Sequence, residues 1–224
     1  MKGGRGVAFL YEDADILVVD KPSGLPVIAP DGSRAMSLYD IVTDRIRQKN
    51  PKGRAAVVHR LDRDSSGVMV FARHAIAKKA LMQHWNDAVL LRRYTALAEG
   101  TAEADSGVFD SWLKEMPSGS VHEVRPGEPG ALRAVTRWRL VGEGKGYSLL
   151  ELDLETGRKH QIRAQLAAAG APIAGDARYG ASTDPLGRLC LHATIIELRH
   201  PRSGEIMRFE SPPPESFAKA LRRG

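Results

Sequence analysis

Two short apolar runs enclose a highly charged turn in the first third of the chain. Val57 and Val58 precede the turn, residues 68–71 follow it, and the turn itself, residues 59–67, reads HRLDRDSSG. Short β-branched runs predict strands, and serine and glycine predict the bend between them. Ionised side chains beside a core are costly unless they are paired. The pattern is therefore typical either of a carboxylate held for chemistry or of an ordinary solvated loop.

The N-terminal segment also has two apolar runs on either side of a charged turn. Apolar runs at 7–11 and 16–19 surround an acidic turn at 12–15. We interpret the two runs as a hairpin or successive strands, with acidic residues that form the turn and have no further role. Prolines and a glycine within 22–26 then predict an irregular loop.

Two helices are predicted in the first half of the chain. Ser37 and Asp40 match a capping box, which begins a helix that ends near 50–53. The apolar face of this helix consists of Leu38, Ile41, Val42 and Ile46. A second helix is predicted over 76–85 from its apolar spacing. Its apolar side consists of Ile76, Ala80, Leu81 and Trp85.

The second half of the chain is dominated by strand patterns. Strands are predicted over residues 92–98, 131–141, 147–154, 190–198 and 205–209. Leucines alternate with acidic residues in 147–154, as in a strand with one buried face. An alanine-rich helix is predicted over 159–169 and a short one after 212–214. The glycine- and proline-rich segment 118–130 predicts a loop or the tip of a β excursion.

Strands with helices inserted at irregular intervals are typical of an α+β fold. We therefore expect a mixed, mainly antiparallel β-sheet with flanking helices. The chain contains no internal repeat and no linker-like composition, so a single domain over residues 1–224 is predicted.

Composition narrows the classes of function. The chain has 224 residues, of which 42% are hydrophobic and 27% charged, as in folded globular proteins. A formal net charge of +6 and a pI of about 9.6 favour polyanionic partners such as nucleic acid. No run approaches the ~20 consecutive apolar residues of a membrane-spanning helix. The composition therefore excludes a disordered or membrane-spanning chain.

Cysteine usage and the N-terminal segment bear on the compartment. Cys190 is the only cysteine, so an internal disulfide is excluded and a reducing compartment fits. The segment from Met1 to Gly6 lacks the apolar stretch of a signal peptide. We therefore expect a cytoplasmic protein.

The charged turn from His59 to Gly67 resembles the signature of the RluA family of RNA pseudouridine synthases. Four further stretches resemble family motifs in the same order along the chain. They are residues 16–27, residues 93–96, residues 156–163, and residues 172–180 together with 189–193. Two positions depart from the family pattern: Ser65 stands where threonine is more frequent, and residues 164–168 lack histidines often found there.

The resemblance implies the pseudouridine synthase fold, with a central RNA-binding cleft, and an isomerase that uses no metal, nucleotide or redox cofactor. In this reaction the N1 glycosidic bond of a uridine breaks, the base turns, and C5 bonds to C1′. Family members often carry an additional N-terminal RNA-binding domain. Because the first motif begins near Ile16, we expect no such domain here and expect the catalytic domain to recognise a structured tRNA or rRNA stem-loop unaided. A monomer is the default expectation, and no contact with a membrane is expected.

The resemblance assigns three catalytic residues. Asp62 matches the catalytic aspartate of the family and must be ionised to act near pH 7. Arg163 matches an arginine whose guanidinium fork suits a carboxylate and favours its ionised form. Tyr94 matches an active-site tyrosine that can stack on the uracil and help to remove the C5 proton. Attack at C1′, attack at C6 and elimination all remain open as routes.

Other matched positions are assigned to RNA binding. The target base must leave its stack to reach Asp62, and basic side chains beside the motifs are expected to contact phosphates. The RNA-binding candidates are Arg60, Arg92, Arg93, Arg158, Lys159 and His160. Leu191 is a candidate wall of the base pocket, for which simple core packing is an equal alternative.

A non-catalytic RNA-binding or RNA-folding protein on the same fold is the alternative function. The presence of Asp62, Tyr94 and Arg163 argues against it, because a binder has no need for a carboxylate that faces phosphates. A glycosidase or nuclease that uses Asp62 and Asp64 is disfavoured, since the sequence shows no cluster with metal-ligand spacing.

Overall fold

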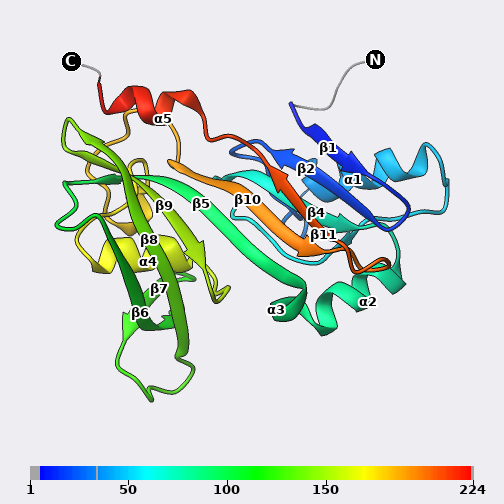
Figure 1. Ribbon diagram of the computed structural model, residues 1–224, viewed down its shortest axis with the longest axis horizontal. Helices are drawn as coiled ribbons and strands as arrows, with labels where there is room; N and C mark the ends of the chain where they lie inside the picture. The colour runs from blue at the N-terminus through cyan, green and yellow to red at the C-terminus, as the bar shows by residue number, and fades with distance from the viewer. Residues whose placement is uncertain (1–5, 34, 223–224) are drawn as a thin grey trace. The chain divides into compact units, whose positions relative to one another are not determined.

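β-Strands make up most of the regular structure in the computed structural model, which describes residues 6–33 and 35–222 (Figure 1). The chain divides into two compact units. The first comprises Met1–Leu91 and Ala193–Pro212, and the second comprises Arg92–His192 and Pro213–Gly224. Each unit is therefore built from two separate stretches of chain, and the single domain over residues 1–224 stays a prediction. Residues 1–5, on which the signal-peptide expectation depends, lie outside the described part.

Buried strands form the centre of the first unit. β2 (Ile16–Lys21) pairs antiparallel with β1 (Ala8–Glu12) and with β4 (Ser66–Ala72), and all seven residues of β4 are buried. β3 (Ala56–Val57) also pairs with β4. These pairings confirm the predicted N-terminal hairpin and the strands on either side of the charged turn.

Two further strands complete the β structure of the first unit. The first two residues of β10 (Leu191–Arg199) belong to the second unit and the others to the first, where the strand pairs antiparallel with β11 (Ile206–Glu210). The predicted closing pair of strands is therefore confirmed.

The first helix begins as its sequence predicts. In α1 (Leu38–Arg47), Ser37 Oγ accepts a hydrogen bond from Asp40 N–H at 3.3 Å. The Asp40 carboxylate accepts one from Ser37 N–H at 2.9 Å. These reciprocal bonds form the predicted capping box, which satisfies two backbone donors at the start of the helix.

The prediction for the buried face of the second helix is confirmed at Leu81 and wrong at Ile76. In α2 (Ala75–Gln83), Ile76 is 80% exposed, whereas Leu81 is buried together with Ala77, which was not on the predicted face. His74 caps this helix by accepting a hydrogen bond from Ala77 N–H at 3.2 Å. The cap starts the helix at Ala75 in a register that turns Ala77 and Leu81 inward. The predicted last residue, Trp85, instead begins the separate turn α3 (Trp85–Ala88).

The second unit is built on five strands, each antiparallel to the next. Their order is β5 (Val89–Glu99), β9 (Tyr147–Leu154), β8 (Leu132–Gly144), β6 (Ser106–Glu115) and β7 (Val121–Val124). The first three residues of β5 belong to the first unit. Leu150 and Leu152 are buried, which confirms the predicted alternation in β9. The predicted β excursion within 118–130 contains β7.

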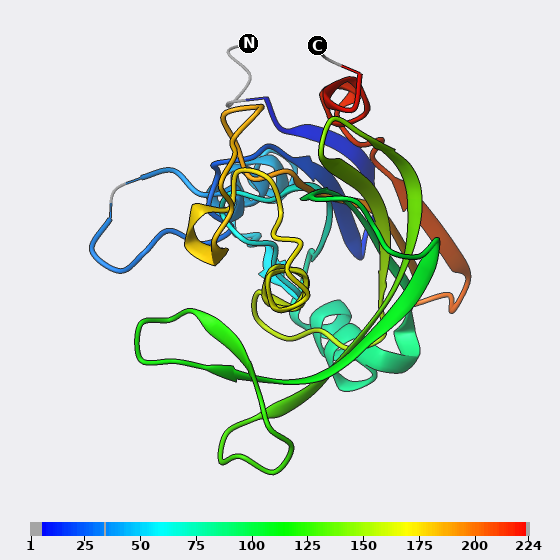
Figure 2. The ribbon, with the colours of Figure 1, turned by 90° about the vertical axis from the view of Figure 1, so that its left-hand side faces the viewer.

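Two helices belong to the second unit. α4 (Gln161–Ala168) packs against β6 and β7 (Figure 2), and its residues from Gln161 to Leu166 are all buried. α5 (Glu215–Ala220) follows the three prolines, as predicted, and packs against β9. With mainly antiparallel strands and few helices, the fold is α+β, as the sequence predicts. Within the described residues, no helix combines the length and the apolar character needed to cross a membrane.

Gly67 is required where the charged turn enters β4. Its φ is +115°, in the region that favours glycine, and a Cβ atom at this position would collide with the backbone of Ala193. The absence of a side chain at position 67 therefore allows the two stretches of backbone to approach closely in the first unit.

Replacing Gly67 with alanine is expected to lower the free energy of unfolding by about 2–4 kcal/mol, because strain in φ and a backbone collision add together. Urea unfolding followed by circular dichroism measures the loss. Gly204→Ala is the matched control, since Gly204 also has a positive φ (+74°) but an added Cβ meets nothing within 4 Å. The control is expected to cost about 1 kcal/mol. Equal losses in the two variants would contradict the role of the close approach.

Candidate functional site

A fully buried lysine holds the loop that carries Asp62. Lys21, the last residue of β2, is 0% exposed. Its Nζ donates hydrogen bonds to the backbone carbonyls of Pro22 at 3.0 Å, Leu25 at 2.7 Å and Arg63 at 2.8 Å. A buried ammonium is costly unless its three N–H groups are bonded. The three carbonyls meet that requirement and join residues 22–25 to the chain directly after Asp62.

Neighbouring residues strengthen the same connection. Gly24 N–H donates to the carbonyl oxygen of Arg63 at 2.9 Å, and Ser23 Oγ donates to that of Asp64 at 2.6 Å. The two residues that follow Asp62 are therefore fixed through their backbone. Their side chains remain available for other contacts.

His59 anchors the other end of the loop. Its Nε2 accepts a hydrogen bond from Val70 N–H at 3.0 Å, and its ring centroid lies 5.2 Å from that of Trp85. Between the two anchors, Leu61 is buried and Asp62 is half-buried. These contacts give His59 a structural role in the first unit. The carboxylate of Asp62 thus stands on a loop that is held on both sides.

The other charges of this loop differ in their surroundings. The Arg63 guanidinium forms a fork with the Asp64 carboxylate, with distances of 2.9 and 3.1 Å. The hydrogen bond from Asp64 raises the pKa of Arg63. Arg60, two residues before Asp62, is exposed. Its contact with an RNA phosphate stays a prediction.

Tyr94 lies in the second unit on β5, opposite Leu152 of β9, where it packs half-buried against the core of that unit. Its neighbour Arg93 forms a fork with the Asp153 carboxylate, with both distances 2.7 Å. Successive side chains of a strand point to opposite faces. Arg93 and Tyr94 therefore serve different faces of the sheet.

Arg163 of α4 forms a buried ion pair with Asp176. The two side chains are 10% and 2% exposed, and the distances are 2.7 Å from Nε to Oδ2 and 2.8 Å from Nη2 to Oδ1. The guanidinium carbon lies 4.8 Å from the centroid of the Tyr179 ring. A planar guanidinium bound through two N–H groups and stacked on a ring has little orientational freedom.

The Tyr179 hydroxyl ties this region to β7. It accepts a hydrogen bond from Val121 N–H at 2.8 Å and lies 2.8 Å from Nδ1 of His160. Burial raises the pKa of Tyr179, although the Val121 N–H and the Arg163 charge oppose the rise. The hydroxyl is therefore protonated at neutral pH, and the ring stays a neutral support for Arg163.

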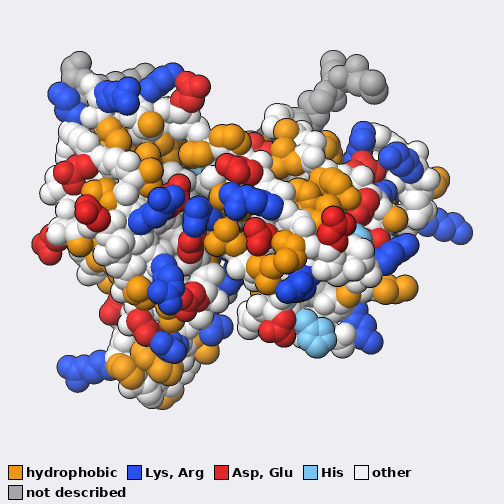
Figure 3. Space-filling model, in the orientation of Figure 1, with side chains coloured by type: hydrophobic (Ala, Val, Ile, Leu, Met, Phe, Trp, Pro, Cys, Tyr) orange, Lys and Arg blue, Asp and Glu red, His pale blue; other side chains and the backbone are white. Residues whose placement is uncertain are grey.

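The other basic candidates already have partners inside the second unit. Arg92 donates to two backbone carbonyls at 3.3 and 3.4 Å, and burial lowers the pKa of its guanidinium. Arg158 donates to a backbone carbonyl at 3.0 Å. Lys159 bonds the Glu115 carboxylate, which lowers the pKa of Glu115. Basic and acidic side chains are likewise interleaved on the face drawn in Figure 3. Arg158 and Lys159 are nevertheless exposed.

Leu191 is 4% exposed and belongs to the hydrophobic core of the second unit. Its packing agrees with the core alternative that the sequence left open. Its role as a wall of the base pocket stays a prediction.

The candidate residues are divided between the two units. Asp62 and Arg60 lie in the first, whereas Tyr94 and Arg163 lie in the second with the remaining candidates. The contacts described above for each candidate are made within its own unit. The assignment of Asp62, Tyr94 and Arg163 to one catalytic centre stays a prediction.

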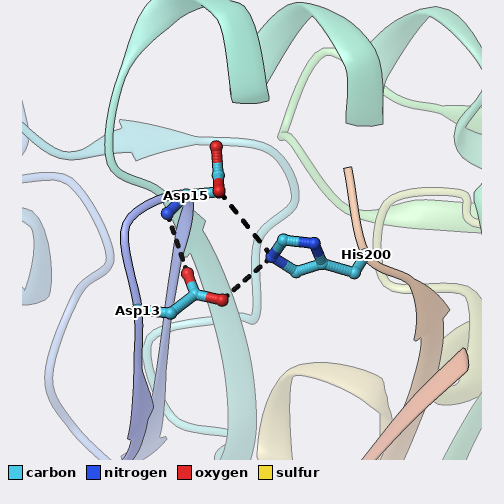
Figure 4. A group of neighbouring side chains, drawn as sticks. All are labelled: Asp13, Asp15 and His200. Carbon is cyan, nitrogen blue, oxygen red and sulfur yellow. Dashed lines mark hydrogen bonds and ion pairs between the residues drawn. The ribbon is translucent and has the colours of Figure 1, made fainter. Parts of the chain in front are cut away.

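Asp13, Asp15 and His200 form a cluster that the sequence did not reveal (Figure 4). One ligand atom from each lies within 4.8 Å of the others, a spacing found in metal sites. His200 Nε2 lies 2.9 Å from Asp13 Oδ2, close enough for an ion pair but outside hydrogen-bond geometry. Asp13 Oδ1 accepts from the N–H groups of Asp15 and Ile16, both at 2.8 Å, which confirms its predicted place in the turn.

The hydrogen bonds and ion pairs of this cluster argue against a bound metal ion. His200 Nδ1 accepts from the N–H groups of Arg202 at 3.4 Å and Ser203 at 3.2 Å, so a neutral ring carries its proton on Nε2. Asp15 is bonded to His74 Nε2 at 3.0 Å and to the Arg202 guanidinium at 2.9 Å. A cation would have to displace that guanidinium and the Nε2 proton. The cluster instead links the β1–β2 turn to other parts of the first unit, and the expectation of no role beyond the turn is wrong.

Three residues that shape these sites were not singled out from the sequence. Lys21 is followed by proline at the end of a buried strand, a position where a charged residue needs a partner. Asp176 and Tyr179 lie in a glycine-bounded loop with one acidic and one aromatic residue. These signals mark residues that need partners, but only the folded chain identifies the partners.

Comparison with known proteins gives one family. The chain matches the family model described as RNA pseudouridylate synthase over residues 15–168, a span that includes Asp62, Tyr94 and Arg163. An uncharacterized RNA pseudouridine synthase of Bacillus subtilis (strain 168), YhcT, is 34% identical over 215 residues, which cover 95% of this chain and 70% of the relative. Ribosomal large subunit pseudouridine synthase D of Nitrosomonas europaea is 37% identical over 226 residues, which cover 95% of this chain and 63% of the relative.

Solved structures share the fold. Human RNA pseudouridylate synthase domain containing 4 superposes with a TM-score of 0.76 at 24% identity, over 96% of this chain and 92% of that one. Human RNA pseudouridylate synthase domain containing 1 superposes with a TM-score of 0.75 at 22% sequence identity. The match covers 100% of this chain and 98% of that one. At these identities the likeness establishes the fold alone.

Replacing Lys21 with methionine is expected to lower the free energy of unfolding by roughly 2–4 kcal/mol, because buried carbonyls lose their donor. Chemical denaturation measures the change, and hydrogen exchange of the Gly24 amide, bonded to the Arg63 carbonyl, reports the loosening of the loop. Lys78→Met on the exposed side of α2 is the control, expected to change stability by less than about 0.5 kcal/mol. An unchanged Gly24 exchange rate in Lys21→Met would show that Lys21 does not hold the loop.

Proposed function

Because the chain belongs to the RluA family of RNA pseudouridine synthases, which are isomerases, we propose that it converts specific uridines of a structured tRNA or rRNA to pseudouridine. We further propose Asp62 as the catalytic carboxylate. The observation that carries the proposal is the family match over residues 15–168, within which Asp62 stands on a loop anchored by Lys21 and His59.

Asp62 acts on the bond between the base and the sugar. The N1–C1′ bond breaks, the detached uracil turns, and C5 bonds to C1′. The C5 proton then leaves and N1 takes up a proton from water, so substrate and product have the same composition. An ionised carboxylate either attacks C1′ or C6, or assists elimination. In every route the carboxylate must be held in place before the base arrives, which the anchored loop supports.

Arg163 and Tyr94 are proposed to serve the same reaction. Arg163 supplies a fixed positive charge, since a guanidinium beside a carboxylate favours the ionised form. Tyr94 stacks on the uracil during its rotation, and its hydroxyl takes part in removing the C5 proton. The half-buried ring of Tyr94 and the buried fork of Arg163 support these roles.

RNA binding is proposed to depend on exposed cations. Arg60, Arg158 and Lys159 are exposed and are the first candidates for phosphate contacts. Arg92, Arg93 and His160 are half-buried and bonded within the protein, so any contact they make with RNA has to compete with those bonds.

Ribosomal RNA is the substrate supported by the names of several relatives, such as the ribosomal large subunit pseudouridine synthase D of Nitrosomonas europaea. We propose a monomer that acts in the cytoplasm on an RNA stem-loop. A loop releases the target base at the lowest unstacking cost. No cofactor is proposed.

RNA labelled with tritium at uracil C5 tests the function. The wild-type protein is expected to release tritium without cutting the strand or freeing a base. Asp62→Asn is expected to lower release at least about 1,000-fold while RNA affinity stays within about threefold, because the amide keeps the shape and loses the charge. Filter binding of the same RNA measures the affinity.

Asp64→Asn is the matched control, since Asp64 lies on the same loop and pairs with Arg63. It is expected to keep release within a few-fold of wild type. Release by Asp62→Asn at the wild-type rate would remove Asp62 from its role. RNA binding by the wild type, without release from any cellular RNA, would favour the non-catalytic alternative.

A further inference from the structure

Asp176 holds the guanidinium to which the proposed function assigns the catalytic charge. We propose that Asp176 is a positioning residue, whose carboxylate fixes Arg163 in one orientation against Tyr179 and so sets the geometry in which Arg163 acts. The geometric part of this inference rests on contacts within the second unit. Its catalytic part rests on the proposed function.

The fork between the two side chains defines the orientation. Asp176 binds the Nε–Nη2 edge of Arg163 through both carboxylate oxygens, at 2.7 and 2.8 Å. A guanidinium has five N–H donors, and this fork uses two of them. The plane of the guanidinium and the direction of its other N–H groups are therefore set by Asp176.

The backbone of Asp176 is itself held firmly. Its N–H donates to the Ile173 carbonyl at 2.9 Å, and its carbonyl accepts from Tyr179 N–H at 2.9 Å and Ala181 N–H at 3.1 Å. Ile173 and the following Ala174 are 0% exposed, in the hydrophobic core of the second unit. A carboxylate mounted on this turn keeps its place when its partner moves.

Tyr179 closes the other side of Arg163. Its ring lies 4.8 Å from the guanidinium carbon, and its hydroxyl is fixed by Val121 N–H at 2.8 Å. The ring packs on the guanidinium, whereas Asp176 lies at its edge. Two contacts in different directions leave the guanidinium one orientation, which is the arrangement expected of a preorganised group.

Charge makes Asp176 more than a packing residue. Arg163 is only 10% exposed along its side chain, and breaking a buried ion pair by removing one partner is strongly destabilising. In Asp176→Asn, one carboxylate oxygen becomes an NH₂ group that faces the N–H donors of Arg163. The two-point fork is then broken, and the orientation that it sets is lost.

The first measurement is independent of catalysis. Nitrogen–proton correlation spectra of the full chain resolve arginine Nε–H groups, and the Arg163 signal is identified by its loss in Arg163→Lys. In wild type this proton is expected to exchange slowly with water. Asp176→Asn is expected to accelerate the exchange at least roughly tenfold. Asp110→Asn, which breaks the exposed Arg133–Asp110 fork, is the matched control and is expected to leave the Arg163 signal unchanged.

The second measurement concerns the reaction. In tritium release, Asp176→Asn is expected to lower kcat roughly 10- to 100-fold with KM within about threefold, because orientation and not RNA binding is lost. In the Arg163→Lys background the same substitution is expected to have little further effect, since a lysine forms no fork. Asp176→Glu keeps the buried pair neutral and serves if Asp176→Asn does not fold; its displaced carboxylate is expected to lower kcat in the same direction.

The outcomes separate this inference from the proposed function. Slow exchange of the Arg163 proton that survives in folded Asp176→Asn would overturn the inference. An equal loss of kcat in the Arg163→Lys background, or a wild-type kcat in Asp176→Glu, would also overturn it. A wild-type protein that releases no tritium, but whose Arg163 signal depends on Asp176, would refute the proposed function and leave the positioning role standing.

Discussion

The buried ammonium of Lys21 is the interaction on which the geometry of the first unit most depends. β2 ends at this residue, and the carbonyls of Pro22, Leu25 and Arg63 converge on its Nζ at 2.7–3.0 Å. Hydrogen bonds from a charged donor are each worth about 1.5–3 kcal/mol, which offsets the cost of burying the charge. These hydrogen bonds hold residues 22–25 against the backbone of Arg63, the residue that follows Asp62.

Lys21 and Arg163 illustrate why the two basic side chains are not interchangeable. Three carbonyls arriving from different directions suit the compact ammonium of Lys21, whereas the two oxygens of Asp176 suit the planar fork of Arg163. Lys21 fixes backbone and has its charge enclosed. Arg163 is itself fixed, by a carboxylate and a ring. Many arginines and lysines pair with carboxylates, as Arg93 does with Asp153 and Lys159 with Glu115. The contact of exposed cations with RNA stays a proposal.

The sequence predicts what depends on neighbouring residues and fails where distant ones decide. The capping box of Ser37 and Asp40 and the alternation in β9 are local patterns, and both are confirmed. Ile76 was assigned to a buried face because apolar spacing alone does not show that His74 sets the register of α2. Arg163 was matched through a motif, but its dependence on Asp176 was not visible, because thirteen positions separate the two residues and no periodic pattern links them. Family motifs thus supplied the candidate chemistry, and the folded chain supplied the partners.

The central claim is that the chain modifies uridines through the carboxylate of Asp62. Mapping pseudouridines in total RNA from cells that lack the gene, and from the same cells supplied with wild type or Asp62→Asn, tests it most directly. The account predicts that one or a few pseudouridines in tRNA or rRNA disappear without the gene, return with wild type, and stay absent with Asp62→Asn. An unchanged map without the gene, or full restoration by Asp62→Asn, would contradict it.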